Sequence, residues 1–396
     1  MAAVPMRARR LLAGLAVLAA AGVAAAFLSL RDKPRTRLVD NSSAVSDLLL
    51  RRRGERSGAE LRGEAGPTLP RGPMSEEDAA LLFPLRAPSY VFDPQAYYVY
   101  RPHYEKRVEW RGHPKGRWIR RTNAAGLRMD AEVSEERPDL RVLVVGDSQT
   151  DGVCDNAESY CALLQAALAA RHVDRSVEVL NAAVMGYSFY NYLGAIEKHL
   201  ALDPQVVVVA FFSGNDFLEM LDPLHYFERT LRPPRSSGYW ERIQKATQLS
   251  SEPLITGINQ ALYFQQYPDE LELAFRGARL ACAEIEAACR ARGAAAIFVH
   301  VPSAFDTSRP EARATLEQLH GALELSEHHL HVGARLAERL IRTLRDSESE
   351  VLDLAPELAR SEEACYWQDF HINLHAHERI AALLLPRIEA AAPFLR

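Results

Sequence analysis

The chain has 396 residues, a net charge of −5 at pH 7, 48% hydrophobic residues and 25% charged residues. These values are typical of a globular protein, and they exclude a wholly disordered chain, a collagen and a membrane protein with many spans. The acidic balance excludes a basic field for nucleic acid, and five cysteines are too few for a disulfide scaffold. This length indicates either two domains or one large domain with appendages.

The first segment, residues 1–31, has the features of an export signal or a membrane anchor. Three arginines precede residues 11–30, which contain no charged residue and as a helix would be about 30 Å long. Small residues at 24–26 suit cleavage by a signal peptidase, whereas retention would leave an anchor. We therefore expect an exported protein, periplasmic or extracytoplasmic, held to the inner membrane if the segment stays uncleaved. In an oxidising compartment Cys154 and Cys161 would be able to pair.

Two segments of different composition follow. Residues 32–86 are rich in Arg, Glu, Gly, Pro and Ser, which predicts a flexible linker with room for one short helix. Residues 87–138 interleave aromatic and basic residues and predict a small β-rich accessory segment. This accessory segment either packs its aromatic side chains on the main domain, which we favour, or exposes them to bind a sugar or a polyanion.

From residue 139 onward, apolar runs alternate with helical patterns. Continuous apolar runs at 140–146 and 205–212 are typical of parallel strands that are buried on both faces. Shorter runs predict strands at 177–180, 295–301 and 350–354, and helical spacing covers 159–170, 271–292, 331–344 and 374–391. The alternation predicts an α/β domain over residues 139–396 with a mainly parallel sheet, interrupted by a proline-containing insertion at about 218–268.

Polar residues follow the predicted strands, at the edge where parallel sheets bind ligands. Ser148 follows the first strand, on a turn that exposes its hydroxyl at a helix N-terminus. Gly186 follows the second strand and offers a backbone N–H, and Asn215 follows the third. Asp369 stands two residues before His371, a compact source of a base and its orienting carboxylate. Each feature alone fits a structural turn or cap, but together they occur in order at the strand ends of one domain.

These residues resemble the four blocks of the SGNH/GDSL hydrolases, over about residues 120–216 and 365–385. The blocks are Gly146-Asp147-Ser148, Gly186, Gly214-Asn215-Asp216 and Asp369-Phe370-His371. The resemblance implies a three-layer, flavodoxin-like α/β/α fold in which Ser148 is the nucleophile, His371 the general base and Asp369 its orienting acid. It also implies an oxyanion hole made of the Ser148 and Gly186 backbone N–H groups and the Asn215 side chain.

The resemblance implies a serine esterase that hydrolyses carboxylic esters, with a small acyl ester or an O-acetylated carbohydrate as substrate. Two alternatives stay open: an O-acyltransferase that acts on envelope glycans, and a non-catalytic envelope protein that binds glycans. The sequence contains no glycine-rich phosphate loop, and the cluster of His328, His329 and His331 is weak evidence of a metal site. We therefore expect no cofactor, no metal and no nucleic acid partner, and the sequence does not determine the oligomeric state.

Overall fold

The computed structural model describes Leu48 and residues 68–85, 87–249, 252–307, 310–368 and 370–395. The expected export segment, residues 1–31, lies outside these residues, as does most of the expected linker. Within the described ranges, no helix is both long enough and apolar enough to cross a membrane.

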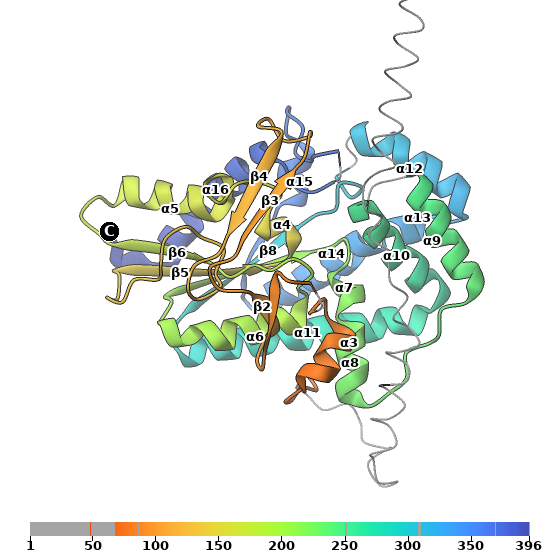
Figure 1. The fold of residues 1–396 in the computed structure, drawn as a ribbon, viewed down its shortest axis with the longest axis horizontal. Helices are drawn as coiled ribbons and strands as arrows, with labels where there is room; N and C mark the ends of the chain where they lie inside the picture. The colour runs from red at the N-terminus through yellow and green to blue at the C-terminus, as the bar shows by residue number, and fades with distance from the viewer. Residues whose placement is uncertain are drawn as a thin grey trace, which may run out of the picture. The chain divides into compact units, whose positions relative to one another are not determined.

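A five-stranded parallel sheet forms the centre of the fold (Figure 1). In sheet order its strands are β6 (Val177–Asn181), β5 (Leu140–Gly146), β7 (Val206–Phe212), β8 (Ala295–Val301) and β9 (Glu350–Asp353). Every residue of β5 and β7 is buried, because helices cover both faces of these valine-rich strands. The first of these strands along the chain, β5, lies between the second and the third, so the strand order reverses there, as in flavodoxin-like folds.

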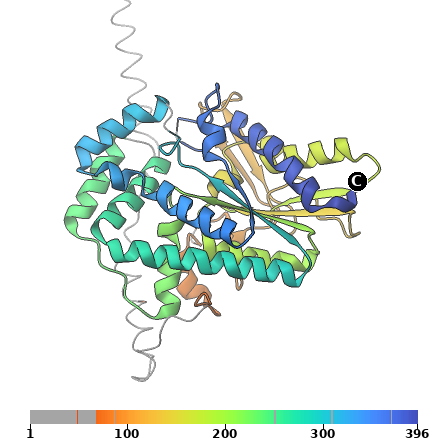
Figure 2. The ribbon, with the colours of Figure 1, turned by 180° about the vertical axis from the view of Figure 1, so that it is seen from behind.

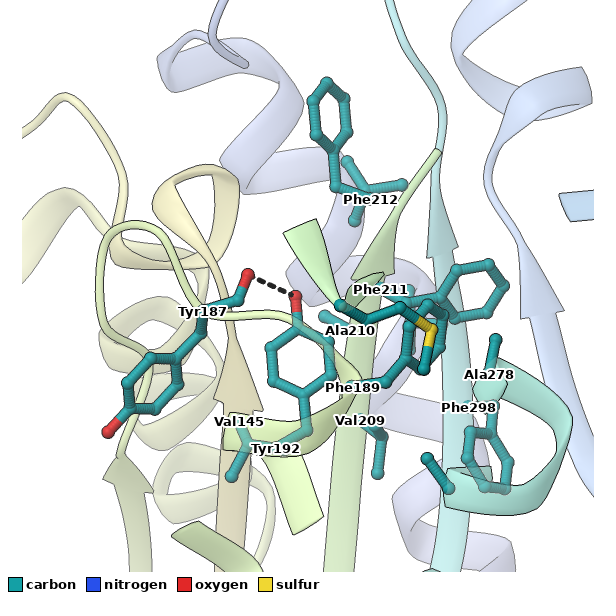
Figure 3. Packing of buried hydrophobic residues seen from close by; sticks show 14 of the residues in the cluster. Val145, Tyr187, Phe189, Tyr192, Val209, Ala210, Phe211, Phe212, Ala278 and Phe298 are labelled. Atoms are coloured by element: carbon teal, nitrogen blue, oxygen red, sulfur yellow. Dashed lines mark hydrogen bonds between the residues drawn. The ribbon is translucent and has the colours of Figure 1, made fainter. Parts of the chain in front are cut away.

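Helices cover both faces of the sheet (Figures 1 and 2). One face carries α5 (Tyr160–Arg171) and α16 (Leu374–Ala391), and the other carries α6 (Phe189–His199), α11 (Pro268–Ala291) and α14 (Val332–Asp346). Figure 3 shows Phe189 and Tyr192 of α6 packed over the central strands, where the Phe189 ring lies 5.9 Å from that of Phe211. The three-layer arrangement with a parallel sheet is therefore confirmed.

The stretch expected as an insertion, about 218–268, folds mainly as helices. After β7 come α7 (Asp216–Glu219), α8 (Leu221–Glu228), α9 (Ser237–Leu249) and α10 (Glu252–Gln266), and after β8 come α12 (Pro310–Leu323) and α13 (Glu327–Leu330). Helix α9 contacts α12, and α10 contacts α13, so these helices gather at one end of the sheet in Figure 1. Further short helices of this domain are α4 (Ser148–Asp151), η2 (Asn156–Glu158), η3 (Leu200–Leu202), α15 (Ala355–Ala359) and η4 (Pro393–Leu395).

The accessory segment, residues 87–138, forms two antiparallel hairpins. The first pairs β1 (Tyr90–Asp93) with β2 (Tyr97–Tyr100), and the second pairs β3 (Glu105–Glu109) with β4 (Arg117–Arg121). Several aromatic side chains of this segment are buried, among them Tyr97, Tyr98, Tyr100 and Trp118. These aromatic residues therefore pack on the domain, as in the interpretation that we favoured, whereas β3 stays largely exposed.

The structure differs from the expected linker over residues 68–85. Helix α3 (Glu76–Leu82) begins after Ser75, whose hydroxyl accepts a hydrogen bond from the Asp78 N–H at 3.1 Å. Leu69 and Met74 belong to the same hydrophobic core as the first hairpin. The composition predicted flexibility because small and polar residues outnumber these few apolar anchors.

A buried cluster of three charges joins the second hairpin to helix α4. Asp151, at the end of α4, is fully buried and accepts hydrogen bonds from the guanidinium of Arg120 in β4. The Nε of Arg128 lies 3.4 Å from the same carboxylate, and both arginine side chains are almost fully buried. The Arg120 guanidinium also lies over the Tyr100 ring, 4.6 Å from its centroid. Asp151 is therefore the one negative charge that compensates two buried cations in this cluster.

We expect Asp151→Asn to lower the free energy of unfolding by about 3–5 kcal/mol, because two buried guanidinium groups lose their counter-charge. Glu109→Gln is the matched control, since Glu109 meets Arg107 at 2.8 Å on the exposed strand β3. An exposed pair of this kind contributes less than about 1 kcal/mol. Urea unfolding followed by circular dichroism measures both variants, and equal effects would show that the cluster does not stabilise the fold.

Candidate active site

The turn after β5 presents Ser148 at the first position of α4. The Asp147 carboxylate caps this helix by accepting a hydrogen bond from the Gln149 N–H at 3.0 Å. Ser148 is partly exposed at the helix N-terminus, where developing negative charge is stabilised. Its position therefore suits a nucleophilic hydroxyl.

The loop before α16 brings a histidine to this serine. The Nε2 of His371 lies 3.2 Å from the Oγ of Ser148, although 223 positions separate the two residues. The Gln149 side chain accepts a hydrogen bond from the Ile372 N–H at 2.9 Å. This bond joins the two neighbours of the pair, because Gln149 follows Ser148 and Ile372 follows His371. Gln149 was not predicted from the sequence as a site residue, although its position directly after Ser148 could have indicated such a role. Asp369, the expected orienting acid, lies outside the described residues.

Aromatic contacts hold the histidine loop on both sides. On one side, the ring of Trp110, which follows β3, meets the Trp367 ring edge to face, with 5.3 Å between centroids. On the other side, Phe305 in the loop after β8 packs against Phe370 at 5.6 Å. Within the loop, the Trp367 N–H donates to the His371 carbonyl at 2.8 Å. The position of His371 therefore depends on two segments that are distant from it in the sequence.

The loop after β6 carries Gly186 and is held by β2. The Tyr98 hydroxyl donates to the Met185 carbonyl at 3.1 Å, and the Tyr100 hydroxyl accepts from the Met185 N–H at 3.2 Å. Gly186 is exposed and has a φ of +82°, and a Cβ at this position would lie 3.0 Å from the Tyr98 hydroxyl. Because β6 pairs in parallel with β5, this loop lies at the edge of the sheet that carries the serine turn.

Asn215 and Asp216 follow β7 at the same edge. Asp216 is fully buried, and its carboxylate accepts hydrogen bonds from the Tyr192 hydroxyl and the Phe212 N–H, both at 2.7 Å. These bonds hold the N-terminus of α7, where Asn215 is partly exposed. Because β7 also pairs in parallel with β5, Asn215 lies at the edge that carries Ser148 and Gly186, and His371 reaches Ser148 from the loop before α16.

Two buried carboxyl groups adjoin the site residues, since Asp147 directly precedes Ser148 and Asp216 directly follows Asn215. Burial raises the pKa of the Asp147 carboxyl to about 6, against the lowering effects of the Gln149 N–H and of His371. Burial also raises the pKa of Asp216 well above its usual range, and the nearby Asp147 carboxyl raises it further. Two carboxyl groups shielded from solvent resist being charged together. Burial therefore favours a proton on this pair of carboxyl groups, close to the catalytic histidine candidate.

A second histidine, His377, lies on α16 but serves the core. It is fully buried, its Nδ1 accepts a hydrogen bond from the Tyr160 N–H at 3.1 Å, and its Nε2 lies 3.7 Å from the Cys154 Sγ. Accepting at Nδ1 places the proton of the neutral ring on Nε2. Burial lowers the pKa of His377 to about 3, so the ring stays neutral at physiological pH.

Cys154 and Cys161, which an oxidising compartment would allow to pair, are both free thiols in the structure. Both side chains are buried. Burial raises the pKa of the Cys154 thiol to about 11, so it is not a thiolate at neutral pH. Neither cysteine therefore competes with Ser148 as a nucleophile.

We expect His377 to make the fold less stable as the pH falls from about 6.5, where the unfolded chain takes up the proton. The folded protein takes it up only near pH 3, so stability that is present at neutral pH is lost on acidification. His377→Asn keeps an acceptor for the Tyr160 N–H and does not titrate. Between pH 7 and pH 5 the variant should lose about 2 kcal/mol less unfolding free energy than the wild type. Urea titrations at both pH values measure this, and parallel pH dependences would contradict it.

The family model of the GDSL-like lipase/acylhydrolase family matches residues 144–379, more than half of the chain. The matched range contains the turns that carry Ser148, Gly186 and Asn215 and the loop that carries His371. No curated protein matches the sequence.

Solved structures similar to this chain include a GDSL-like lipase from Bacteroides thetaiotaomicron, with 12% identity over 64% of this chain and 89% of that chain and a TM-score of 0.35. A lipase/acylhydrolase from Enterococcus faecalis has 14% identity, covers 63% of this chain and 96% of that one, and gives a TM-score of 0.34. A catalytic mutant of an acetylxylan esterase from Geobacillus stearothermophilus has 10% identity over 65% of this chain and 96% of that chain, with a TM-score of 0.36. On the family match, the chain belongs to the GDSL-like lipase/acylhydrolase family and is an enzyme that hydrolyses esters.

Proposed function

We propose that this enzyme is a serine esterase that hydrolyses carboxylic esters through an acyl-enzyme on Ser148. The observation that carries the proposal is the 3.2 Å separation between the Ser148 Oγ and the His371 Nε2. At this distance the imidazole can accept the hydroxyl proton while the oxygen attacks a carbonyl carbon. The role of Asp369 as the acid that orients His371 belongs to the same proposal and rests on its place in the motif.

In the first half-reaction, the Ser148 oxygen bonds to the ester carbonyl carbon and His371 holds the displaced proton. The carbonyl oxygen becomes an oxyanion, which accepts hydrogen bonds from the backbone N–H groups of Ser148 and Gly186 and from the Asn215 amide. When the C–O bond to the alcohol breaks, His371 gives its proton to the leaving oxygen, and the acyl group stays on Ser148.

In the second half-reaction, a water molecule takes the place of the departed alcohol. His371 accepts one of its protons as the water oxygen attacks the acyl carbon. The second tetrahedral intermediate uses the same oxyanion donors. Its collapse breaks the bond to Ser148, which recovers its proton from His371, and the carboxylic acid leaves.

For the substrate we propose an O-acetyl ester of a carbohydrate, met outside the cytoplasm. The apolar segment at residues 11–30 supports export, with the enzyme tethered to the inner membrane if the segment is retained. Trp110 and Trp367 support a carbohydrate, because both are partly exposed beside the His371 loop and offer aromatic faces with polar edges.

Ser148→Ala should lower kcat for p-nitrophenyl acetate by at least about 10³-fold, because no nucleophile remains. A fluorophosphonate probe should label the wild type and not this variant. Ser347→Ala, at an exposed helix end, is the control and should keep both turnover and labelling. Covalent labelling of the Ser148→Ala variant would rule out an acyl-enzyme on this serine.

Asn215→Ala should lower kcat by about 10²–10³-fold, because its amide donates to an oxyanion that exists only during the reaction. The change in KM should be smaller, since a ground-state ester carries less negative charge on its carbonyl oxygen. Steady-state kinetics with p-nitrophenyl acetate separate the two parameters. A raised KM at unchanged kcat would instead assign Asn215 to substrate binding.

A further inference from the structure

A small cavity lies beyond the carboxyl ends of β7 and β8. Its volume is about 20 Å³, which is room for one or two water-sized groups. Ser213 and Gly214 line it from the end of β7, Asp306 lines it from the loop after β8, and Gly257 lines it from α10. The helices that follow β7 and β8 thus enclose a space that neither the serine turn nor the histidine loop fills.

The cavity borders the candidate active site through two shared segments. Ser213 and Gly214 directly precede Asn215 in the chain. Phe305, which also lines the cavity, packs against Phe370, the residue directly before His371, at 5.6 Å. The cavity therefore shares its wall with the segment that carries Asn215 and with a residue that contacts the histidine loop.

Asp306 gives the cavity wall a buried carboxylate, since its side chain is only 4% exposed. One oxygen accepts a hydrogen bond from the Ser213 hydroxyl at 3.2 Å, and the other lies 3.4 Å from the Nδ1 of His331. The Ser213 hydroxyl in turn accepts a hydrogen bond from the Ser303 N–H at 3.1 Å, which fixes its direction. A carboxylate accepts about four hydrogen bonds, so Asp306 keeps acceptor capacity for a group in the cavity.

His331 determines which kind of group this carboxylate suits. The hydrogen bond to Asp306 raises the pKa of His331, which favours an imidazolium beside the carboxylate. Asp306 already interacts with His331 and with the Arg335 guanidinium, so a further cation would gain little there, whereas a hydroxyl group still finds an oriented acceptor. Much of the remaining wall is apolar, formed by Ile258, Leu319, Leu330 and Val332.

We propose that this cavity is a substrate subsite in which Asp306 accepts a hydrogen bond from a hydroxyl group on the alcohol part of a carbohydrate ester. The proposal rests on the esterase function and the carbohydrate ester proposed above, and it assigns the residue that recognises the alcohol part of that ester. It makes Asp306 a specificity-determining residue that takes no part in bond breaking. A carboxylate that only held the loop after β8 would also bond to Ser213, but it would not distinguish substrates with hydroxyl groups from substrates without them.

Two acetates test this subsite, namely 6-O-acetyl-glucose and (tetrahydropyran-2-yl)methyl acetate, which keeps the pyran ring and the ester position but lacks the hydroxyl groups. The wild type should prefer the sugar acetate by at least about tenfold in kcat/KM, because a site built for a hydroxyl group disfavours an analogue that leaves its polar groups unpaired. Turnover of p-nitrophenyl acetate is measured alongside, as the readout of the esterase itself.

Two substitutions should reduce this preference about tenfold, for different reasons. Asp306→Asn keeps an acceptor for Ser213 but removes the charge that strengthens the bond to a substrate hydroxyl. Gly257→Ala leaves the carboxylate intact and adds a methyl group to the wall, where a Cβ would lie 3.6 Å from the Gly214 carbonyl oxygen, an ordinary contact. Gly321→Ala in α12 is the matched control, since a Cβ there has no neighbour within 4 Å, and it should keep the wild-type preference.

Thermal unfolding shows whether each variant is folded. Gly257→Ala replaces a helical glycine by the residue with the highest helix propensity, so it keeps the test decisive if Asp306→Asn does not fold. Equal kcat/KM values of the wild type for the two acetates, or a preference that persists in the folded variants, would overturn the subsite. A wild type that hydrolyses none of the three esters would contradict the esterase function instead, so the two failures are distinguishable.

Discussion

The parallel pairing of β5 with β6 on one side and with β7 on the other is the constraint on which the site depends. Parallel strands end at the same edge, so the turns that follow these three strands converge there. Every residue of β5 and β7 is buried, and β6 is buried apart from Val177 at its start, which gives the turns a rigid base. Catalytic groups that must hold their places within a fraction of an ångström need such a base.

The histidine loop is the exception, because it does not follow one of these three strands. It reaches Ser148 through bonds of its own: Ile372 donates to Gln149, and the rings of Trp367 and Phe370 contact Trp110 and Phe305. The loop after β6 is held in a similar way, because two tyrosine hydroxyls of the first hairpin bond to the N–H and the carbonyl of one residue, Met185. The accessory segment is thus part of the structure that positions the active site.

The central strands and the motif turns could be predicted from the sequence because their signals are local. The apolar run at 140–146 coincides with β5, since the same seven residues that form the strand are all buried. Gly186 was recognisable because its positive φ excludes most other residues at that point of the loop. Ser148 and His371 were recognisable only because their neighbours in the chain form compact motifs.

The buried charge cluster, the order of residues 68–85 and the surroundings of Asp306 could not be predicted, because they depend on contacts between segments that are distant in the sequence. The residues next to Asp151 in the sequence do not indicate that two arginines of the accessory segment pair with its carboxylate. Residues 68–85 look like a linker, yet a few apolar side chains such as Leu69 anchor them to the core. Asp306 follows β8 without any motif, and its partners Ser213 and His331 come from separate parts of the chain.

The contact between Trp110 and Trp367 has a consequence for how this chain can vary. A segment that only decorates a catalytic domain can be exchanged, shortened or lost through recombination while the enzyme keeps working. The hairpin that carries Trp110 does not have this freedom, since a shift of its tip is passed to the loop that holds the histidine. We therefore expect a change in one of these two segments to require a compensating change in the other.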